Sequence, residues 1–287
     1  MAEVFRARVL SGPRIGQNVA IKRLLPGFAE DPSYLDQFTS EADLSRYLNH
    51  PNIVKVHEAG VLKDVYYIAM EWIDGCDLSH IVRRLQHRKV SLPVDFAVYV
   101  VKVLLEALAY AHRAVGPTGK PLRIVHCDVS PSNLFISRTG EIKLGDFGIA
   151  RSAAGGGPGR DLAGKPYYLS PELIDGLPVT PAADLWAASV TLFELLTLQR
   201  PFNGGSSDQV FAAIRGAKPA SVAKLRPEVS PVLAEMVKKT LAKSPQDRFA
   251  TAEEFSAALS TQCDERIGTP LAIAAVVRGL FGPGEQF

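Results

Sequence analysis

The chain has 287 residues, of which 47% are hydrophobic and 22% charged, and this ordinary globular composition excludes a disordered or fibrous protein. The net charge is only +2, from 32 lysines and arginines against 30 acidic residues, so we expect neither a nucleic-acid clamp nor a polybasic membrane patch. The three cysteines are odd in number and lie far apart. This spacing argues against a disulfide framework or a zinc site and favours a reducing cytoplasm.

No segment of the sequence reaches the roughly 18 uninterrupted apolar residues that crossing a bilayer requires. The N-terminus carries Glu3 and Arg6 where a signal peptide would have its apolar core. The sequence therefore predicts a soluble, cytoplasmic protein that is not secreted and does not insert into a membrane.

The first part of the chain, residues 1–73, is predicted to be rich in strands. Short β-type runs indicate strands over residues 4–10, 18–24, 53–61 and 65–72. One helix is expected among them, because Asp31 is a suitable N-cap and Pro32 fits the first helical position. Apolar or small residues then recur at helical spacing, namely Leu35, Phe38, Ser45 and Leu48.

The rest of the chain is predicted to be mainly helical. Apolar spacing indicates helices over residues 78–86, 94–114, 181–198, 206–215, 231–242 and 252–260. A β-hairpin is expected over residues 134–137 and 141–144, around a turn that contains Gly140. The glycine-rich residues 153–161 are expected to form a flexible loop.

These elements predict a bilobal α+β protein with a cleft between its lobes. Residues 1–73 would form the small lobe and residues 74–263 the larger, helical lobe. Residues 264–287 would be a C-terminal extension, in which residues 269–281 form a short amphipathic helix that packs on the large lobe or leads to a further region.

The predicted hairpin brings polar residues together at its open end, where the first strand begins and the second ends. Asn133 opens its first strand and Asp146 closes its second, so their side chains should be neighbours across a spacing of about 5 Å. Asp128 precedes Asn133 by a short loop. Carboxylate and carbonyl oxygens are the ligands that Mg²⁺ prefers when it bridges a polyphosphate. The three residues therefore predict a magnesium–polyphosphate site, with ordinary turn capping as the alternative.

A second polar pair interrupts apolar positions. Glu41 falls between Phe38 and Ser45 on the helix stripe that is predicted to face inward, and a buried carboxylate is costly unless it is paired. Lys22 interrupts an apolar strand run in the same way. An ion pair between Lys22 and Glu41 would satisfy both groups, and from the residues alone it is as well explained by a structural role as by a catalytic one.

The sequence resembles the eukaryotic-type protein kinases, in the branch found in bacteria, over nearly its whole length. The matching motifs stand in the family's order and spacing, and they are Val-Ala-Ile-Lys22, Glu41, His126-Cys127-Asp128 with Asn133, Asp146-Phe147-Gly148, Ser170-Pro171-Glu172, Asp184-Leu185-Trp186 and Arg248. The resemblance implies the kinase fold, with a small β-rich N-lobe and a larger α-helical C-lobe, ATP and Mg²⁺ as cofactors, and a protein substrate.

The resemblance also implies roles for the polar residues. Lys22 would hold the α- and β-phosphates of ATP and would be positioned by Glu41. Asp146 and Asn133 would bind Mg²⁺. Asp128 would accept the proton of the substrate hydroxyl. Phosphoryl transfer needs mainly positioning and charge neutralisation, which this set of side chains can supply.

The adenine site follows from the same resemblance. Met70 stands where the family places the residue at the back of the adenine pocket. The backbone of the next three residues would hydrogen-bond the adenine edge and link the two lobes. These residues are Glu71, Trp72 and Ile73.

Other motif residues are expected to be structural. His126 would brace Phe147 in the core and would not act as a base. Glu172 and Arg248 would form a buried ion pair, and the motif aspartate Asp184 would anchor the backbone of the catalytic loop.

The sequence departs from the family pattern at its start. The family's first strand and glycine-rich nucleotide loop have no counterpart, because residues 1–5 match the stretch that follows those glycines. That loop provides backbone N–H groups to the phosphates and excludes water, so we expect ATP affinity and turnover to suffer. A truncated sequence or a misplaced start codon would explain the departure, and so would a natural pseudokinase or scaffold.

Two further departures concern the activation segment. Cys127 replaces the arginine that receives a phosphorylated residue in the family, and residues 146–172 contain no threonine. Activity is therefore expected not to depend on phosphorylation of candidate acceptors such as Ser152 and Tyr167. In addition, Ser130 replaces the lysine that touches the γ-phosphate, while Lys165 replaces the threonine that usually bonds that lysine.

We hypothesise that the Lys165 ammonium stabilises the transferring phosphoryl group or orients Asp128, with a solvated loop lysine as the alternative. The whole sequence is interpreted as a serine/threonine kinase domain that acts in signalling, and a regulatory region in a longer parent protein is a further expectation. A catalytically impaired scaffold remains open, as does a small-molecule phosphotransferase. The latter normally lacks the Ser-Pro-Glu segment and its arginine, so Glu172 and Arg248 favour a protein substrate.

Overall fold

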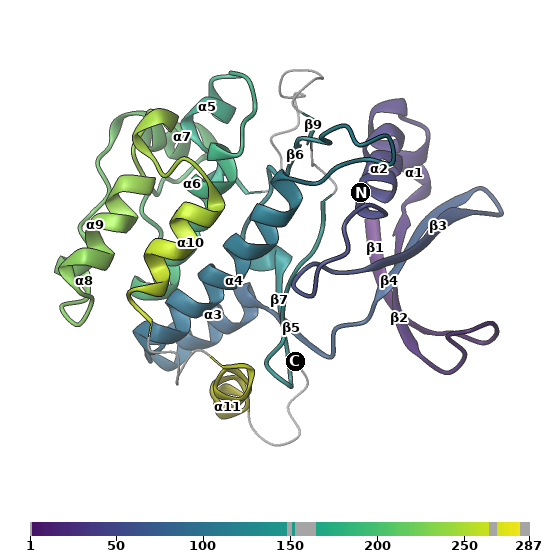
Figure 1. Ribbon diagram of the computed structural model, residues 1–287, viewed down its shortest axis with the longest axis horizontal. Helices are drawn as coiled ribbons and strands as arrows, with labels where there is room; N and C mark the ends of the chain where they lie inside the picture. The colour runs from purple at the N-terminus through teal and green to yellow at the C-terminus, as the bar shows by residue number, and fades with distance from the viewer. Residues whose placement is uncertain (1, 148–150, 153–164, 264–268, 282–287) are drawn as a thin grey trace.

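The computed structural model describes residues 2–147, 151–152, 165–263 and 269–281, which form a sheet-rich part and a larger helical part (Figure 1). The sheet and two helices lie on one side of Figure 1 and the helical bundle on the other, joined by the segment after β4. The predicted bilobal α+β architecture is therefore confirmed. The loop predicted over residues 153–161 lies outside the described residues, as does the motif residue Gly148.

The small lobe contains a four-stranded antiparallel sheet with the strand order β1-β2-β4-β3. Its strands are β1 (Ala2–Arg8), β2 (Asn18–Leu24), β3 (Val56–Leu62) and β4 (Val65–Glu71). The turn between β3 and β4 consists of Lys63 and Asp64, with φ of 48° and 64°, the left-handed geometry that suits the twist of a two-residue hairpin. The strand predicted over residues 4–10 ends at Arg8 instead, because Val9 pairs with Gln17 to start the following turn.

The helices of the small lobe are α1 (Pro26–Ala29), which sequence reasoning missed, and α2 (Pro32–Ser45). The carboxylate of Asp31 caps α2 by accepting the Ser33 backbone N–H at 2.8 Å, and Pro32 occupies the first turn, as predicted. Phe38 and Glu41 are 2% and 5% exposed. This face of α2 is therefore buried as predicted, and the Glu41 carboxylate on it contacts the sheet through Lys22.

The large lobe is a helical bundle around α4 and α6, both of which are buried along most of their length. Its longer helices are α3 (Leu78–Arg88), α4 (Val94–His112), α6 (Ala182–Thr197), α7 (Ser207–Gly216), α9 (Pro231–Thr240) and α10 (Ala252–Ser260). Its short helices are α5 (Pro171–Ile174) and α8 (Val222–Leu225), with 3₁₀ turns at Pro131–Asn133, Pro166–Tyr168 and Pro245–Asp247. The longer helices match the predicted ones to within two residues at each end. Within the described ranges, every helix is too short or too polar to span a lipid bilayer.

Short strands line the junction of the two lobes. They are β5 (Gly75–Asp77), β6 (Ile124–Val125), β7 (Leu134–Ser137), β8 (Ile142–Leu144) and β9 (Arg151–Ser152). The hairpin of β7 and β8 was predicted, whereas the pairing of β5 with β7 and of β6 with β9 was not. At Gly75 the chain approaches the Ile136 carbonyl oxygen so closely that any Cβ would collide with it, so glycine is required there.

The segment between α2 and β3 attaches the small lobe to the large one. The Val54 N–H donates to the Leu144 carbonyl oxygen at 2.8 Å, and the Leu144 N–H donates to the Asn52 carbonyl oxygen at 2.8 Å. The Lys143 ammonium adds an ion pair of 3.0 Å to Glu71. This attachment explains why the strand predicted over residues 53–61 begins only at Val56: its first residues pair with the other lobe.

The last described helix, α11 (Pro270–Leu280), docks against α3 (Figure 1), in agreement with the amphipathic helix predicted over residues 269–281. Arg84 donates to the Leu280 carbonyl oxygen at 3.2 Å and Arg88 to that of Gly279 at 3.3 Å. The tip of the β7–β8 hairpin also contacts this helix. There, Gly140 has φ of 87° and lies against the Pro270 carbonyl oxygen, so that an added Cβ would collide with it.

Candidate active site

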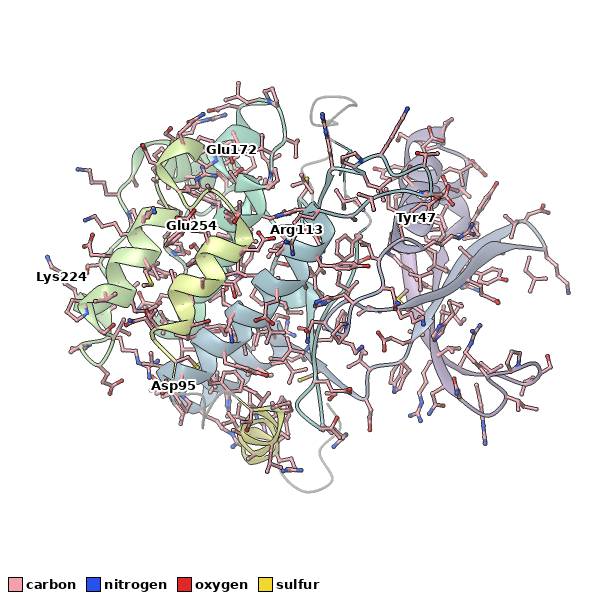
Figure 2. All side chains as sticks on the ribbon, in the orientation of Figure 1. Tyr47, Asp95, Arg113, Glu172, Lys224 and Glu254 are labelled. Atoms are coloured by element: carbon pink, nitrogen blue, oxygen red, sulfur yellow. The ribbon has the colours of Figure 1, made fainter. Side chains whose placement is uncertain are left out.

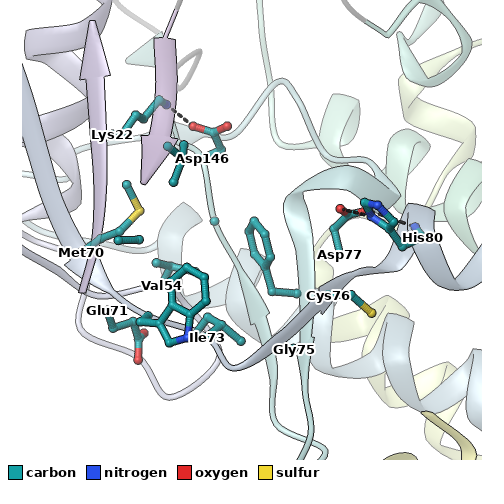
Figure 3. Close-up of a pocket in the computed structure, with 15 residues that line it drawn as sticks. Lys22, Val54, Met70, Glu71, Ile73, Gly75, Cys76, Asp77, His80 and Asp146 are labelled. Carbon is teal, nitrogen blue, oxygen red and sulfur yellow. Dashed lines mark hydrogen bonds and ion pairs between the residues drawn. The ribbon is translucent and has the colours of Figure 1, made fainter. Parts of the chain in front are cut away.

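A cavity of about 260 Å³ lies between the two lobes (Figure 3). Apolar side chains from both lobes line it, with Ala20 and Val54 from the small lobe and Phe135 from the large lobe. Figure 3 shows Lys22 and Asp146 joined by an ion pair at one end. A narrow apolar slot with charged groups at its end suits a flat ring that carries an ionic substituent.

The predicted adenine-site residues Met70, Glu71, Trp72 and Ile73 all line this cavity. Sequence reasoning missed other lining residues, which include Val4, Ala20, Val54, Cys76, Asp77, His80 and Phe135. Strand alternation would have identified Ala20, since it lies two residues before Lys22 and must share its face of the sheet. The remaining residues lie on segments whose meeting depends on the tertiary fold.

The predicted ion pair between Lys22 and Glu41 is present. The Lys22 ammonium donates to both carboxylate oxygens of Glu41 at 2.8 Å, and the two residues are 7% and 5% exposed. Lys22 extends from β2 and Glu41 from the buried stripe of α2, so the pair ties the sheet to its helix. The same ammonium also donates to Asp146, which belongs to the large lobe.

The close contact of these three groups shifts their proton affinities. Burial raises the pKa of Glu41 to about 7, in spite of the opposing Lys22 ammonium. Burial acts to lower the pKa of Lys22, but the carboxylates of Asp146 and Glu41 outweigh it and hold this pKa well above its usual value. Desolvation acts to raise the pKa of Asp146, and Lys22 overcomes it and holds that pKa below the usual range. Lys22 and Asp146 are therefore both charged at neutral pH.

A second polar cluster lies on the large-lobe side and consists of Asp128, Asn133 and Lys165. The Asn133 amide N–H group donates to the carbonyl oxygen and to Oδ2 of Asp128, each at 2.8 Å. The Lys165 ammonium donates to Oδ2 of Asp128 at 2.8 Å and to Oδ1 of Asn133 at 2.9 Å. This network is self-consistent only with the Asn133 oxygen facing the lysine, which fixes the orientation of the amide.

The backbones of Asn133 and Asp146 come together as the hairpin predicted, since the Gly145 N–H donates to the Asn133 carbonyl oxygen at 2.9 Å. Among the described residues, no group of three or more histidine, cysteine, aspartate or glutamate side chains is arranged to hold a metal ion by itself. Mg²⁺ usually takes one or two carboxylates and completes its shell with water and phosphate oxygens. The carboxylate of Asp146 and the amide oxygen of Asn133 fit this smaller donor set.

The loop that carries Asp128 is held by the buried carboxylate of Asp184, as predicted. This carboxylate accepts the backbone N–H groups of His126 and Cys127, each at 2.9 Å, and contacts the His112 ring at 2.8 Å, a partner that sequence reasoning missed. Burial acts to raise the pKa of Asp184, but the hydrogen bond from His112 and the neighbouring donors hold it below its usual value. These bonds hold Cys127 at a left-handed φ of 63°, a conformation that costs about 1–3 kcal/mol where the surroundings do not impose it.

The His126 side chain is occupied by structural contacts, as predicted. Its Nδ1 accepts the Asp128 backbone N–H at 3.2 Å, which leaves the proton on Nε2 to be donated to the Gly145 carbonyl oxygen at 3.0 Å. The ring centroid lies 4.5 Å from that of Phe147. The ring therefore braces the backbone on both sides of the site and is not available as a base.

The segment after Lys165 is fixed to the large lobe by contacts that sequence reasoning missed. The Tyr168 hydroxyl donates to Glu194 on α6, and burial beside this carboxylate raises the pKa of Tyr168. Arg200 lies 3.4 Å from Glu194 and stacks over the Tyr167 ring at 4.0 Å. These contacts anchor the backbone that carries the lysine.

The predicted pair of Glu172 and Arg248 is also present, in the interior of the large lobe. Their two contacts measure 2.7 and 2.8 Å, and the arginine side chain is 0% exposed. Figure 2 shows Glu172 in the helical part, and neither residue lines the interlobe cavity. The pair holds α5 to the segment that precedes α10 and takes no part in the site.

Comparison with known proteins places these observations in context. The model of the protein kinase domain family matches residues 3–259. The tyrosine-protein kinase MasK of Myxococcus xanthus is 36% identical, over 98% of this chain and 44% of that protein. The serine/threonine-protein kinase PrkC of Bacillus subtilis is 32% identical, over 92% and 39%. PknB of Mycobacterium leprae, also named a serine/threonine-protein kinase, is 35% identical, over 90% and 40%.

The chain thus spans less than half the length of these curated relatives. Among solved structures, the kinase domain of PknI from Mycobacterium tuberculosis superposes with a TM-score of 0.68 at 28% identity. The superposition covers 92% of this chain and 91% of that one.

Proposed function

Because this chain belongs to the protein kinase domain family, we propose that it transfers the γ-phosphoryl group of ATP to serine or threonine hydroxyls of another protein. One observation carries the proposal: two polar pairs from distant parts of the sequence are held next to each other where the lobes meet. Lys22 bonds Asp146 at one end of the cavity, Asn133 bonds Asp128, and the Gly145 N–H, just before Asp146, donates to the Asn133 carbonyl oxygen. Ordinary packing does not require such a cluster, whereas phosphoryl transfer does.

The apolar part of the cavity would bind the adenine ring. Ala20 and Phe135 would lie against its two faces, and Met70 would close the back of the slot. The backbone from Glu71 to Ile73 offers the N–H and carbonyl groups that would pair with the adenine edge. This assignment is supported by the position of all these residues on the cavity wall.

The charged end of the cavity would bind the phosphates. The Lys22 ammonium would hold the α- and β-phosphates, and Glu41 would keep that ammonium in place. Asp146 and Asn133 would hold Mg²⁺, which neutralises phosphate charge when bound. The low pKa of Asp146 supports this role, because a metal ligand must be ionised.

Asp128 would act on the substrate. The hydroxyl oxygen of the acceptor forms a bond to the γ-phosphorus while the bond from that phosphorus to the bridging oxygen of ADP breaks, and the hydroxyl proton passes to the Asp128 carboxylate. The side chain of Asp128 is 21% exposed, so part of it is accessible to a substrate. Its hydrogen bond from Asn133 would orient it for this step.

A transfer assay tests the proposal. Radiolabelled phosphate from ATP should appear on a generic basic protein with the wild-type chain, and the Asp128→Asn variant should lose at least about a hundredfold of this activity. A chain that is extended at its N-terminus by a glycine-rich nucleotide loop should be faster than the present one. The proposal would be contradicted if neither the wild-type chain nor the extended chain transferred phosphate.

Two alternatives have their own readouts. Since one relative is named a tyrosine-protein kinase, phosphoamino-acid analysis of the product will show whether serine and threonine or tyrosine carry the label. A binding module without catalysis would show a nucleotide-dependent rise in Tm and no transfer. A cytoplasmic location, where ATP is available, fits the proposed activity.

A further inference from the structure

The contact of Lys165 with Asp128 and Asn133 is the feature of the site that the kinase resemblance does not account for. The ammonium lies 2.8 Å from Oδ2 of Asp128 and 2.9 Å from Oδ1 of Asn133. The side chains of Lys165 and Asp128 are only 25% and 21% exposed. A solvated loop lysine would not be held by two partners in this way, so this geometry favours a role in the site.

The catalytic loop itself offers no cation at the corresponding place. Ser130 is 1% exposed, and its hydroxyl lies 3.2 Å from that of Ser132. A hydroxyl of this kind carries no charge that could balance a carboxylate or a phosphate. Asp128 therefore obtains its ion pair from Lys165, on the other wall of the site.

The position of Lys165 is set by its backbone. The Tyr168 N–H donates to the Lys165 carbonyl oxygen at 3.1 Å and closes the 3₁₀ turn. The Tyr168 hydroxyl bonds Glu194, and Tyr167 stacks against Arg200. The backbone that follows the lysine is thus tied to α6, whereas the long side chain of Lys165 has four rotatable bonds and can change its partners.

Two cations would bind the same amide oxygen of Asn133. The proposed function uses this atom, Oδ1, as a ligand of Mg²⁺, whereas the structure shows it accepting from the Lys165 ammonium at 2.9 Å. An ammonium and a divalent ion on one oxygen would lie within a few ångströms of each other, where like charges repel strongly. The two cations therefore exclude each other at Asn133.

We propose that Lys165 is a positioning cation that stands in for the divalent metal at Asn133 before nucleotide binds. In that state it holds Asp128 and Asn133 in the arrangement that the reaction needs. When Mg²⁺ and nucleotide bind, the ammonium leaves Asn133, remains near Asp128 and supplies the charge beside the transferred phosphoryl group that Ser130 cannot. The competition at Asn133 rests on the Mg²⁺ site of the proposed function but not on phosphoryl transfer, whereas the second half of this proposal rests on transfer as well.

Metal binding tests the competition without any catalysis. Mg²⁺ is titrated at saturating ADP, and the rise in Tm gives the half-maximal Mg²⁺ concentration. Replacing Lys165→Met should lower this concentration at least about fivefold, the size of a typical coupling between two bound ligands. The matched control is Lys224→Met, an exposed lysine at the far edge of the large lobe (Figure 2), which should change nothing. A value for Lys165→Met within about twofold of wild type would overturn the competition.

Transfer kinetics test the second half. Lys165→Met should lower kcat about a hundredfold, as does the loss of one donor that acts on developing charge, with little change in the KM for ATP. Lys165→Arg, which keeps the charge, should retain most of kcat. The double variant Ser130→Lys with Lys165→Thr should regain at least about tenfold over Lys165→Thr alone. A loss of less than about threefold in Lys165→Met, or no regain in the double variant, would overturn the role in transfer.

The two proposals fail in different ways. A wild-type chain that binds Mg²⁺ and ADP but transfers no phosphate contradicts the proposed function, and a lowered Mg²⁺ requirement in Lys165→Met would still support the competition. A wild-type chain that transfers phosphate, with neither readout sensitive to Lys165, supports the proposed function and overturns the inference.

Discussion

Two buried ion pairs, one in each lobe, have nearly the same geometry and very different surroundings. The closest approach is 2.7 Å between Glu172 and Arg248 and 2.8 Å between Lys22 and Glu41. Arg248 donates its remaining N–H groups to three main-chain carbonyl oxygens. Lys22 instead reaches a third side chain, Asp146, which is 45% exposed toward the cavity.

Distance and burial therefore do not distinguish a structural pair from a functional one. The guanidinium nitrogens of Arg248 all donate to acceptors inside the protein. The pair therefore has no donor left for a ligand, and it can only hold segments of the chain together. Around Lys22, two carboxylates share one ammonium beside a cavity. The excess negative charge can take up a metal ion, and the ammonium can take up a phosphate, so this arrangement can bind a ligand.

The largest effect should come from breaking the pair in the large lobe. Arg248→Leu leaves the Glu172 carboxylate buried without a partner and should lower the free energy of unfolding by about 3–5 kcal/mol, measured by chemical denaturation. Arg113→Leu is the control, because the side chains of Arg113 and its partner Glu253 are 72% and 40% exposed. That change should cost less than about 1 kcal/mol. Equal losses of unfolding free energy in Arg248→Leu and Arg113→Leu would contradict the structural role of the buried pair.

Breaking the pair beside the cavity should affect activity more than stability. Lys22→Met should reduce phosphoryl transfer at least about a hundredfold, or about 2.7 kcal/mol in transition-state stabilisation. The unfolding free energy should fall by only about 1 kcal/mol, because Glu41, with its pKa already near 7, can take up a proton when it loses its partner. Kinetics and denaturation on the same preparation check both values. A stability loss as large as that of Arg248→Leu would contradict the prediction.

Replacing both partners sharpens the comparison. The double variant Glu172→Leu with Arg248→Met should be about 1–2 kcal/mol more stable than Arg248→Met alone, since no buried charge is left unpaired. Full recovery is not expected, because three carbonyl oxygens still lose their donor. The corresponding double variant Lys22→Met with Glu41→Leu should regain no activity. Denaturation and transfer assays on the wild type, the two double variants and their four single variants, which include Glu172→Leu and Glu41→Leu, give the two coupling energies. Recovered transfer would refute the functional assignment.

The smallest effect concerns Lys243, a neighbour of Arg248. Burial and the adjacent Arg248 charge lower the pKa of Lys243 to about 8 in the folded protein. Between about pH 8 and 10.5 the unfolded chain therefore binds more protons at this position than the folded one, so stability should rise with pH across that window. The rise, about 1 kcal/mol relative to Lys243→Met, is measured by denaturation at several pH values. Parallel curves for the two proteins would show that Lys243 titrates normally.

Features with a signal close by in the sequence could be predicted. The start of α2 follows from Asp31 and Pro32, which are adjacent to the helix that they cap. The β7–β8 hairpin follows from two short strands around a glycine turn. The Lys22–Glu41 pair could also be predicted, because strand and helix periodicity each put one charge on an apolar face. In these cases local geometry restricts the answer before the tertiary fold is known.

Features that depend on where distant segments meet could not be predicted. Nothing near Gly75 indicates that β5 pairs with β7, and nothing near Lys165 indicates its contact with Asn133. Cys127 is not a residue type that favours a left-handed backbone, and its φ of 63° is held by hydrogen bonds to Asp184, far away in sequence. The resemblance located the motif residues and led us to expect Lys165 beside Asp128, but it did not predict the second contact of Lys165, with Asn133.

Because Gly140 lies so close to Pro270, the residue type at position 140 is informative in related sequences. The carbonyl oxygen of Pro270 occupies the space in which any other residue would place its Cβ, and the φ of 87° also favours glycine. A related chain with a side chain at this turn could not seat a helix like α11 in the same pose. The residue type at a single turn of the hairpin thus becomes a marker, readable from sequence alone, for whether a following helix can dock against α3.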